Sequence, residues 1–224
     1  MTRRWESLET EDTPDGRLEL RRRAEDDFLI LLDGRILMNS RANRSELALG
    51  ELAARSCADG RSPRMLIGGL GMGYTLRAAL DALPETAEVV VSEINEVVIR
   101  WCREALGPLT NAAIEDPRVR LEASDVALQI REAGGAGKAF DTIALDLYEG
   151  PHPNLRSRNE SQFNAAALRT IHRALRPQGV LALWTEHRDP PFERRLGSAG
   201  FTLDVRRPGR GGLRHAVYLA RRRR

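Results

Sequence analysis

Four acidic residues follow predicted strands at the point where each strand ends. They are Glu93, Asp125, Asp146 and Glu186. Because the carboxyl ends of parallel strands meet at one edge of a sheet, we expect these side chains to converge on one crevice, where ligands of open α/β sheets bind. A carboxylate in such a crevice can accept hydrogen bonds from ribose hydroxyls, take a proton from an attacking amine, or stabilise a developing positive charge.

A glycine-rich turn precedes these acids along the chain. Gly69, Gly71 and Gly73 form the pattern G-x-G-x-G, and glycines let a backbone turn sharply and approach a ligand closely. A dinucleotide site has G-x-G-x-x-G, and here Tyr74 occupies the position of the last glycine. The turn therefore indicates a nucleoside without a pyrophosphate. Glu93, about 20 residues further on, is placed to accept hydrogen bonds from the ribose.

Short apolar segments alternate with segments of helical periodicity from residue 64 onward. Strands are expected near 65–67, 89–91, 119–121, 140–145 and 180–184. Helices are expected near 75–83, 95–106, 126–133, 161–175 and 191–199. This alternation predicts α/β architecture, with a parallel sheet and helices on both faces. Trp184, at the end of the last of these strands, is expected in the core.

Two further strands, near 201–205 and 216–220, are predicted to close the sheet as a hairpin. That ending is typical of methyltransferase-type sheets, whereas nicotinamide-binding sheets usually end differently. Together with Tyr74 it argues against a dehydrogenase. The predicted fold is a Rossmann-like class I methyltransferase fold, with a mostly parallel seven-stranded sheet and a terminal β-hairpin.

The segment before this sheet has a different pattern. Residues 17–38 read as short antiparallel strands, and Asp33-Gly34 between two apolar runs is a hairpin turn signal. A helix is expected over 45–54. We predict a small N-terminal β unit over residues 1–48 and a Rossmann-like domain over 49–224. Edge strands of the β unit invite pairing with a second copy, which predicts a homodimer.

The bulk composition excludes several classes of protein. Hydrophobic residues make up 42% and charged residues 30%, an ordinary globular balance without a run long enough for a membrane helix. The first residues lack the apolar stretch of a signal peptide, and two cysteines make neither a disulfide framework nor a metal site, so we expect a cytoplasmic protein without metal. The net charge is +3 and residues 221–224 are arginines, but no nucleic-acid-binding motif accompanies them, so nucleic acid is not an expected partner.

Several motifs resemble those of the spermidine synthase family. Residues 69–77 read G-L-G-M-G-Y-T-L-R, similar to the family's G-G-G-D-G-G-T-L-R. Residues 93–95 read E-I-N where the family has E-I-D, and residues 116–119 match its D-P-R-V. Residues 146–151, D-L-Y-E-G-P, fall on D-S-S-D-P with one additional residue, and residues 32–34 match L-D-G.

The resemblance implies an enzyme that moves the aminopropyl group of decarboxylated S-adenosylmethionine to a small amine. It implies that Glu93 holds the ribose and Asp125 the adenine of this adenosyl-sulfonium. Asp146 would then orient and deprotonate the attacking amine. Glu149 falls where a second carboxylate binds the amine substrate, and Tyr148 beside it is a candidate for facing the acceptor.

The chain departs from the family at the polyamine and aminopropyl ends of the site. Met72 stands in place of the aspartate that binds the aminopropyl ammonium, Ala42 in place of an aspartate, and Leu37 in place of a glutamine. Glu46 replaces a tyrosine and, with Glu186, is a further candidate for substrate binding. A methyltransferase that uses S-adenosylmethionine and a catalytically inert nucleotide-binding protein therefore stay open as alternatives.

Overall fold

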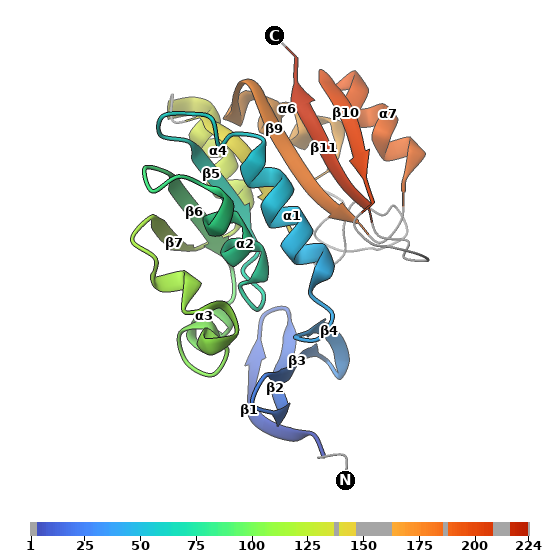
Figure 1. The fold of residues 1–224 in the computed structure, drawn as a ribbon. Helices are drawn as coiled ribbons and strands as arrows, with labels where there is room; N and C mark the ends of the chain where they lie inside the picture. The colour runs from blue at the N-terminus through green and yellow to red at the C-terminus, as the bar shows by residue number, and fades with distance from the viewer. Residues whose placement is uncertain (1–3, 137–138, 147–162, 186–187, 208–215, 224) are drawn as a thin grey trace.

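The computed structural model describes residues 4–136, 139–146, 163–185, 188–207 and 216–223. A small sheet at the N-terminus lies below a larger sheet that has helices on both faces (Figure 1). No helix in these described ranges is long and apolar enough to cross a membrane.

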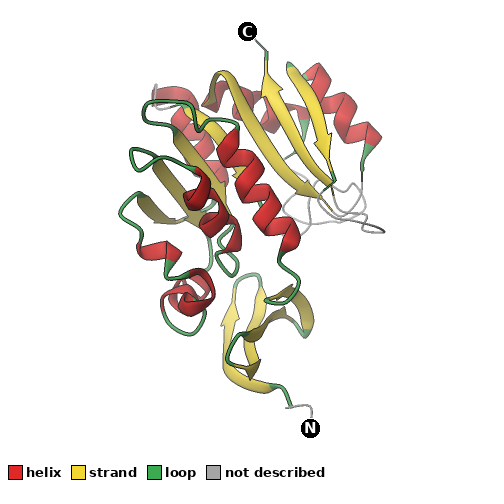
Figure 2. Cartoon of the chain, viewed as in Figure 1, coloured by secondary structure: helices red, strands yellow, loops and turns green. Residues whose placement is uncertain are grey.

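The N-terminal sheet is antiparallel, and over residues 6–39 its strands follow one another in chain order. They are β1 (Glu6–Thr13), β2 (Gly16–Ala24), β3 (Asp27–Leu32) and β4 (Arg35–Asn39). In Figure 2 this part consists of strands and turns only. Asp33 and Gly34, at the β3–β4 turn, have φ of 49° and 77°, the left-handed values of a tight hairpin turn. The predicted antiparallel β unit is confirmed, but it has an additional strand, β1, before the strands predicted over residues 17–38.

Seven strands form the larger sheet in the described part of the chain, in the order β10-β11-β9-β8-β5-β6-β7. They are β5 (Arg64–Gly68), β6 (Glu88–Glu93), β7 (Val119–Ala123), β8 (Phe140–Leu145), β9 (Leu175–Thr185), β10 (Phe201–Arg206) and β11 (Ala216–Arg222). Strands β5 to β9 are parallel, and β11 runs antiparallel between β9 and β10. The predicted fold class and terminal hairpin are confirmed.

The helices divide between the two faces of this sheet. They are α1 (Arg44–Arg55), α2 (Tyr74–Ala82), α3 (Glu96–Arg103), α4 (Val126–Ala136), α6 (Ala165–Ala174) and α7 (Pro190–Ser198), with 3-10 turns at Gly107–Thr110 and Ala113–Glu115. Successive strand residues face opposite sides, so Met65 and Ile67 belong to one apolar cluster with residues of α1, α2 and α3, whereas Leu66 belongs to a second with residues of α4, α6 and α7. The helix predicted to run to residue 106 ends at Arg103.

The N-terminal sheet shares its core with the larger domain. Leu18, Leu20, Phe28 and Ile30 are at most 2% exposed and belong to the same apolar cluster as α1 and α2. This packing holds the turns of the N-terminal sheet against the carboxyl ends of the parallel strands. The predicted boundary after residue 48 falls inside α1 and stays a prediction.

Candidate active site

A cavity of about 1120 Å³ lies at the carboxyl ends of the parallel strands, next to the N-terminal sheet. The order of the strands reverses beside β5, which has β6 on one side and β8 on the other, and such a switch point is the usual ligand site of an open α/β sheet. The predicted site residues that line the cavity are Glu46, Gly69, Gly71, Glu93, Asp125 and Asp146. Gly73 does not line it; it caps α2 with φ of 82°. Tyr148, Glu149 and Glu186 lie outside the described residues.

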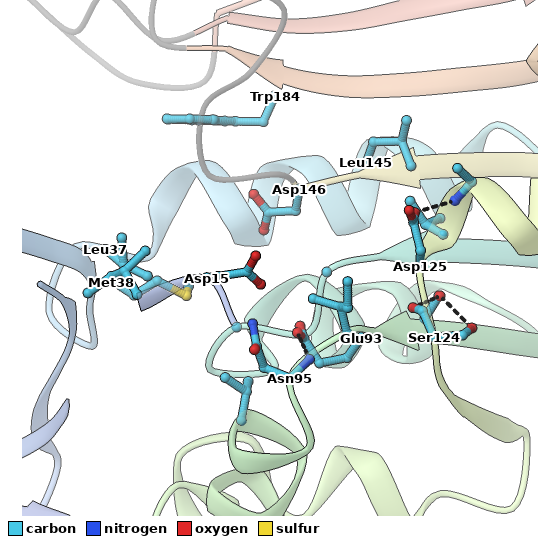
Figure 3. Close-up of a pocket in the computed structure, with 18 of the residues that line it drawn as sticks. Asp15, Leu37, Met38, Glu93, Asn95, Ser124, Asp125, Leu145, Asp146 and Trp184 are labelled. Carbon is cyan, nitrogen blue, oxygen red and sulfur yellow. Dashed lines mark hydrogen bonds between the residues drawn. The ribbon is translucent and has the colours of Figure 1, made fainter. Parts of the chain in front are cut away.

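Glu93 is the last residue of β6 and is only 8% exposed. Its Oε2 accepts a hydrogen bond from the backbone N–H of Leu70 at 2.8 Å, and its Oε1 accepts one from the N–H of Asn95 at 2.9 Å (Figure 3). The two bonds fix the orientation of the carboxylate at the cavity wall. Each oxygen has a further lone pair, so the carboxylate can also accept hydrogen bonds from the two hydroxyls of a ribose.

The glycine turn between β5 and α2 adopts backbone conformations that only glycine tolerates well. Gly69 has φ of 90° and Gly71 has φ of 53°. A Cβ atom at position 71 would overlap the sulfur of Met38 on β4. The N-terminal sheet therefore presses directly on the turn, and glycine at 71 makes that close approach possible.

Asp125 lies between β7 and α4. Its Oδ1 accepts a hydrogen bond from the backbone N–H of Ala127 at 2.8 Å, which fixes the carboxylate at the start of the helix. The end of β7 is tied to that of β6, because Ser92 Oγ donates to the carbonyl of Ser124 at 2.7 Å. Glu93 and Asp125 thus occupy one side of the cavity on a rigid support.

Asp146 follows β8, and its backbone N–H donates to the carbonyl of Gly68 at 3.0 Å. Its side chain retains partial exposure to the cavity but is largely enclosed by protein. This burial, together with the charge of Glu46, raises the pKa of Asp146 to about 7, against the opposing hydrogen bond from Thr75. The carboxyl group can therefore take up and release a proton near neutral pH, as a general base in catalysis must.

Thr75 connects Asp146 to Glu46. The Thr75 hydroxyl lies 2.8 Å from Asp146 Oδ2 and 3.3 Å from the backbone carbonyl oxygen of Glu46. It carries one proton, so it donates to Asp146 when that group is charged and can donate to the Glu46 carbonyl when Asp146 is protonated. The Glu46 side chain, in the first turn of α1, accepts a hydrogen bond from Ser45 Oγ at 2.6 Å. The Thr75 hydroxyl can therefore form a hydrogen bond with Asp146 whether Asp146 is charged or protonated.

The lining of the cavity includes residues whose place was not predicted from the sequence, and it confirms Leu37 as part of the site. Asp15, in the β1–β2 turn, lines the cavity, and the only signal for it was the turn pattern Pro14-Asp15-Gly16. Leu37 and Met38 on β4 form part of an apolar wall. Trp184 was expected in the core; it packs on the core but also lines the cavity and is partly exposed.

Comparison with known proteins identifies the family. The sequence model of the spermine/spermidine synthase domain matches residues 56–193, which is more than half of the chain. The chain belongs to the spermine/spermidine synthase family. The resemblance found in its motifs is thereby confirmed, and the match covers both the glycine turn and the strand ends that carry Glu93, Asp125 and Asp146.

Individual members of the spermine/spermidine synthase family match over part of their length. Polyamine aminopropyltransferase 1 of Hyperthermus butylicus is 32% identical over 118 residues, which cover 53% of this chain and 39% of that protein. The polyamine aminopropyltransferase of Nitrosomonas europaea is 33% identical over 130 residues, covering 56% and 37%. The chain thus matches well under half the length of these relatives. The structure of spermidine synthase from Thermotoga maritima has the same fold, with a TM-score of 0.71 at 19% identity over 96% of this chain and 72% of that one.

Position 72 is one place where this family member departs from the motif. Met72 is fully buried and does not line the cavity. The glycine turn therefore supplies backbone to the cavity but no charged side chain, and any charge on this side must come from another element.

Proposed function

We propose that this chain transfers the aminopropyl group of decarboxylated S-adenosylmethionine to a small primary amine. The charge of the cavity is the observation that carries the proposal. Among the described residues, one guanidinium, that of Arg131, and five carboxylates line it. The carboxylates belong to Asp15, Glu46, Glu93, Asp125 and Asp146. A donor with an ammonium and no carboxylate complements this charge, whereas the carboxylate of intact S-adenosylmethionine is repelled by it.

The adenosine part of the donor is assigned to the side of the cavity formed by β6 and β7. Glu93 accepts hydrogen bonds from the ribose hydroxyls, and Asp125 accepts one from the adenine amino group. Gly69 and Gly71 let the nucleoside lie close to the backbone. These are the roles expected from the sequence, and the hydrogen bonds that orient both carboxylates support them.

Asp146 is assigned to the transfer step. The acceptor amine is protonated in neutral solution, and an amine attacks only after it has lost that proton. The Asp146 carboxylate accepts the proton, and the nitrogen then forms a bond to the methylene carbon next to the sulfonium. The carbon–sulfur bond breaks, its electron pair passes to sulfur, and a neutral thioether, 5′-methylthioadenosine, leaves. Glu46 is proposed to bind the acceptor, as are Tyr148 and Glu149, which follow Asp146 in the sequence.

Turnover with the two forms of the donor tests this proposal. With decarboxylated S-adenosylmethionine and a series of diamines, we expect 5′-methylthioadenosine and an aminopropylated amine, detected by mass spectrometry. With intact S-adenosylmethionine we expect no methylated amine. Methylation of the amine would establish the methyltransferase alternative instead, and an absence of both turnover and binding would establish the inert protein.

We also propose that two copies pair through the edge of the N-terminal sheet. Strand β4 is the last strand of that sheet and carries Ile36 at 57% exposure. Light scattering should then give twice the mass of the chain, and a monomeric mass at assay concentrations would refute the pairing. A cytoplasmic location is a further proposal, supported by the unpaired thiols of Cys57 and Cys102; cell fractionation would test it.

A further inference from the structure

The turn between β1 and β2 brings a carboxylate into the cavity from outside the Rossmann-like domain. Pro14 and Asp15, at the tip of this hairpin, both line the cavity. In Figure 3 the carboxylate of Asp15 extends over the region between Asp146 and Glu93, and it is turned toward the same space as Asp146. Asp15 therefore faces the space between the proposed ribose site at Glu93 and the proposed amine site at Asp146, which the aminopropyl group must occupy.

The conformation of this turn is held by its own hydrogen bonds. Thr13 Oγ1 donates to the carbonyl of Gly16 at 2.7 Å and accepts from the N–H of Asp15 at 3.3 Å. Gly16 has φ of 128°, and a Cβ there would lie 2.6 Å from the carboxylate of Asp33. That carboxylate accepts a bond from the N–H of Arg17 at 2.9 Å. The tip is thus built against the neighbouring β3–β4 turn rather than free to swing.

The hairpin is also anchored to the Rossmann-like domain. Trp101 on α3 donates its indole N–H to Glu9 at 2.7 Å, and the guanidinium of Arg100 pairs with both Glu9 and Glu11. Helix α3 begins at Glu96, close after Glu93 at the end of β6, so the helix that follows the proposed ribose-binding residue also positions the hairpin. The place of Asp15 relative to the nucleoside is therefore set by fixed contacts.

The other carboxylates of the lining lie at positions that suit different tasks. Glu93 and Asp125 are oriented by backbone N–H groups on the nucleoside side. Glu46 lies close enough to raise the pKa of Asp146, so these two form one group on the α1 and β8 side. The glycine turn contributes no charged side chain to the lining, and Asp15 is the described carboxylate that the N-terminal sheet contributes.

We propose that Asp15 binds the ammonium group at the end of the donor's aminopropyl chain and thereby selects the decarboxylated donor. The inference rests on the proposed function and extends it. The methylenes of that chain have an apolar surface to lie on, since Leu37 and Met38 line the cavity next to Asp15. Intact S-adenosylmethionine carries its carboxylate on the carbon that bears the ammonium. Asp15 would repel that carboxylate at the position where it attracts the decarboxylated form.

Replacement of Asp15 by Asn tests this role through two ligands that differ in the aminopropyl group. By calorimetry at neutral pH, we expect Asp15→Asn to weaken binding of decarboxylated S-adenosylmethionine by about tenfold or more, the effect of losing a charge-assisted hydrogen bond. Binding of 5′-methylthioadenosine, which lacks the ammonium, should stay within about twofold of the unmodified protein and also reports that the variant folds. Asp12→Asn is the matched control, because Asp12 is an exposed carboxylate of the same hairpin outside the cavity lining.

The possible outcomes separate this inference from the proposed function. Equal affinity of Asp15→Asn and the unmodified protein for the decarboxylated donor would overturn the role of Asp15 and leave the proposed function standing. An equal loss for both ligands would also overturn it, because Asp15 would then act on the nucleoside. If the unmodified protein bound neither ligand, the proposed function and the role of Asp15 would fall together.

Discussion

Replacement of Asp146 by Asn is expected to lower kcat by about 10²- to 10⁴-fold, the usual contribution of a positioned general base. The amide has the size of the carboxyl group, and its oxygen can still accept the hydrogen bond from Thr75. It cannot take a proton from the acceptor amine. Affinity for 5′-methylthioadenosine should therefore change by no more than about twofold, and turnover together with calorimetry measures both quantities.

The pH dependence of the reaction distinguishes a proton acceptor from a merely structural aspartate. The pKa of Asp146 is raised to about 7, so the group is protonated and inactive as a base below that pH and charged above it. In the unmodified enzyme kcat/KM should rise with pH through about 7, and this inflection should be missing from the residual activity of Asp146→Asn. Asp59→Asn, an exposed position outside the cavity lining, is the matched control. Full turnover by Asp146→Asn would remove Asp146 from the transfer step.

Replacement of Glu93 by Gln is expected to weaken 5′-methylthioadenosine binding by about 10²- to 10³-fold. Both oxygens of Glu93 accept backbone N–H groups, so an amide must turn its NH₂ toward one of these donors. The variant also loses the charge that strengthens the hydrogen bonds to two ribose hydroxyls, each worth about 1.5–3 kcal/mol with a charged acceptor. Calorimetry measures the loss.

Glu96→Gln provides the control for this experiment. Glu96 lies three positions further on, in the first turn of α3, is exposed, and does not line the cavity. It should bind the ligand as the unmodified protein does. If Glu93→Gln remained folded, as judged by its thermal melting, and bound with unchanged affinity, the ribose would have to lie elsewhere.

The site is assembled from two parts of the chain that are folded around one core. The larger sheet supplies the carboxylates at its strand ends, and the N-terminal sheet supplies the apolar wall and Asp15. The contact between Gly71 and Met38, and the pairs that join α3 to β1, hold the two parts together at the cavity itself. Changes in this contact should therefore affect substrate binding as well as stability.

The sequence by itself determined the fold of the larger domain and the place of its site. In the sequence, short apolar runs indicate buried parallel strands, and apolar residues at helical spacing indicate helices. The order of the elements could therefore be derived from local patterns. Because such strands share one carboxyl edge, the convergence of Glu93, Asp125 and Asp146 followed from that order alone. The glycine pattern and the family motifs then indicated the kind of ligand.

Only the tertiary structure decided the features that depend on packing between distant segments. Strand β1 was missed because its residues are mostly polar and exposed and show no apolar alternation. In the sequence Asp15 is an ordinary turn residue. It lies in the cavity only because the N-terminal sheet packs against α3 and the glycine turn. The raised pKa of Asp146 depends on burial and on the nearby charge of Glu46, which lies on another helix. Distances across the fold set these properties, and local sequence patterns do not encode them.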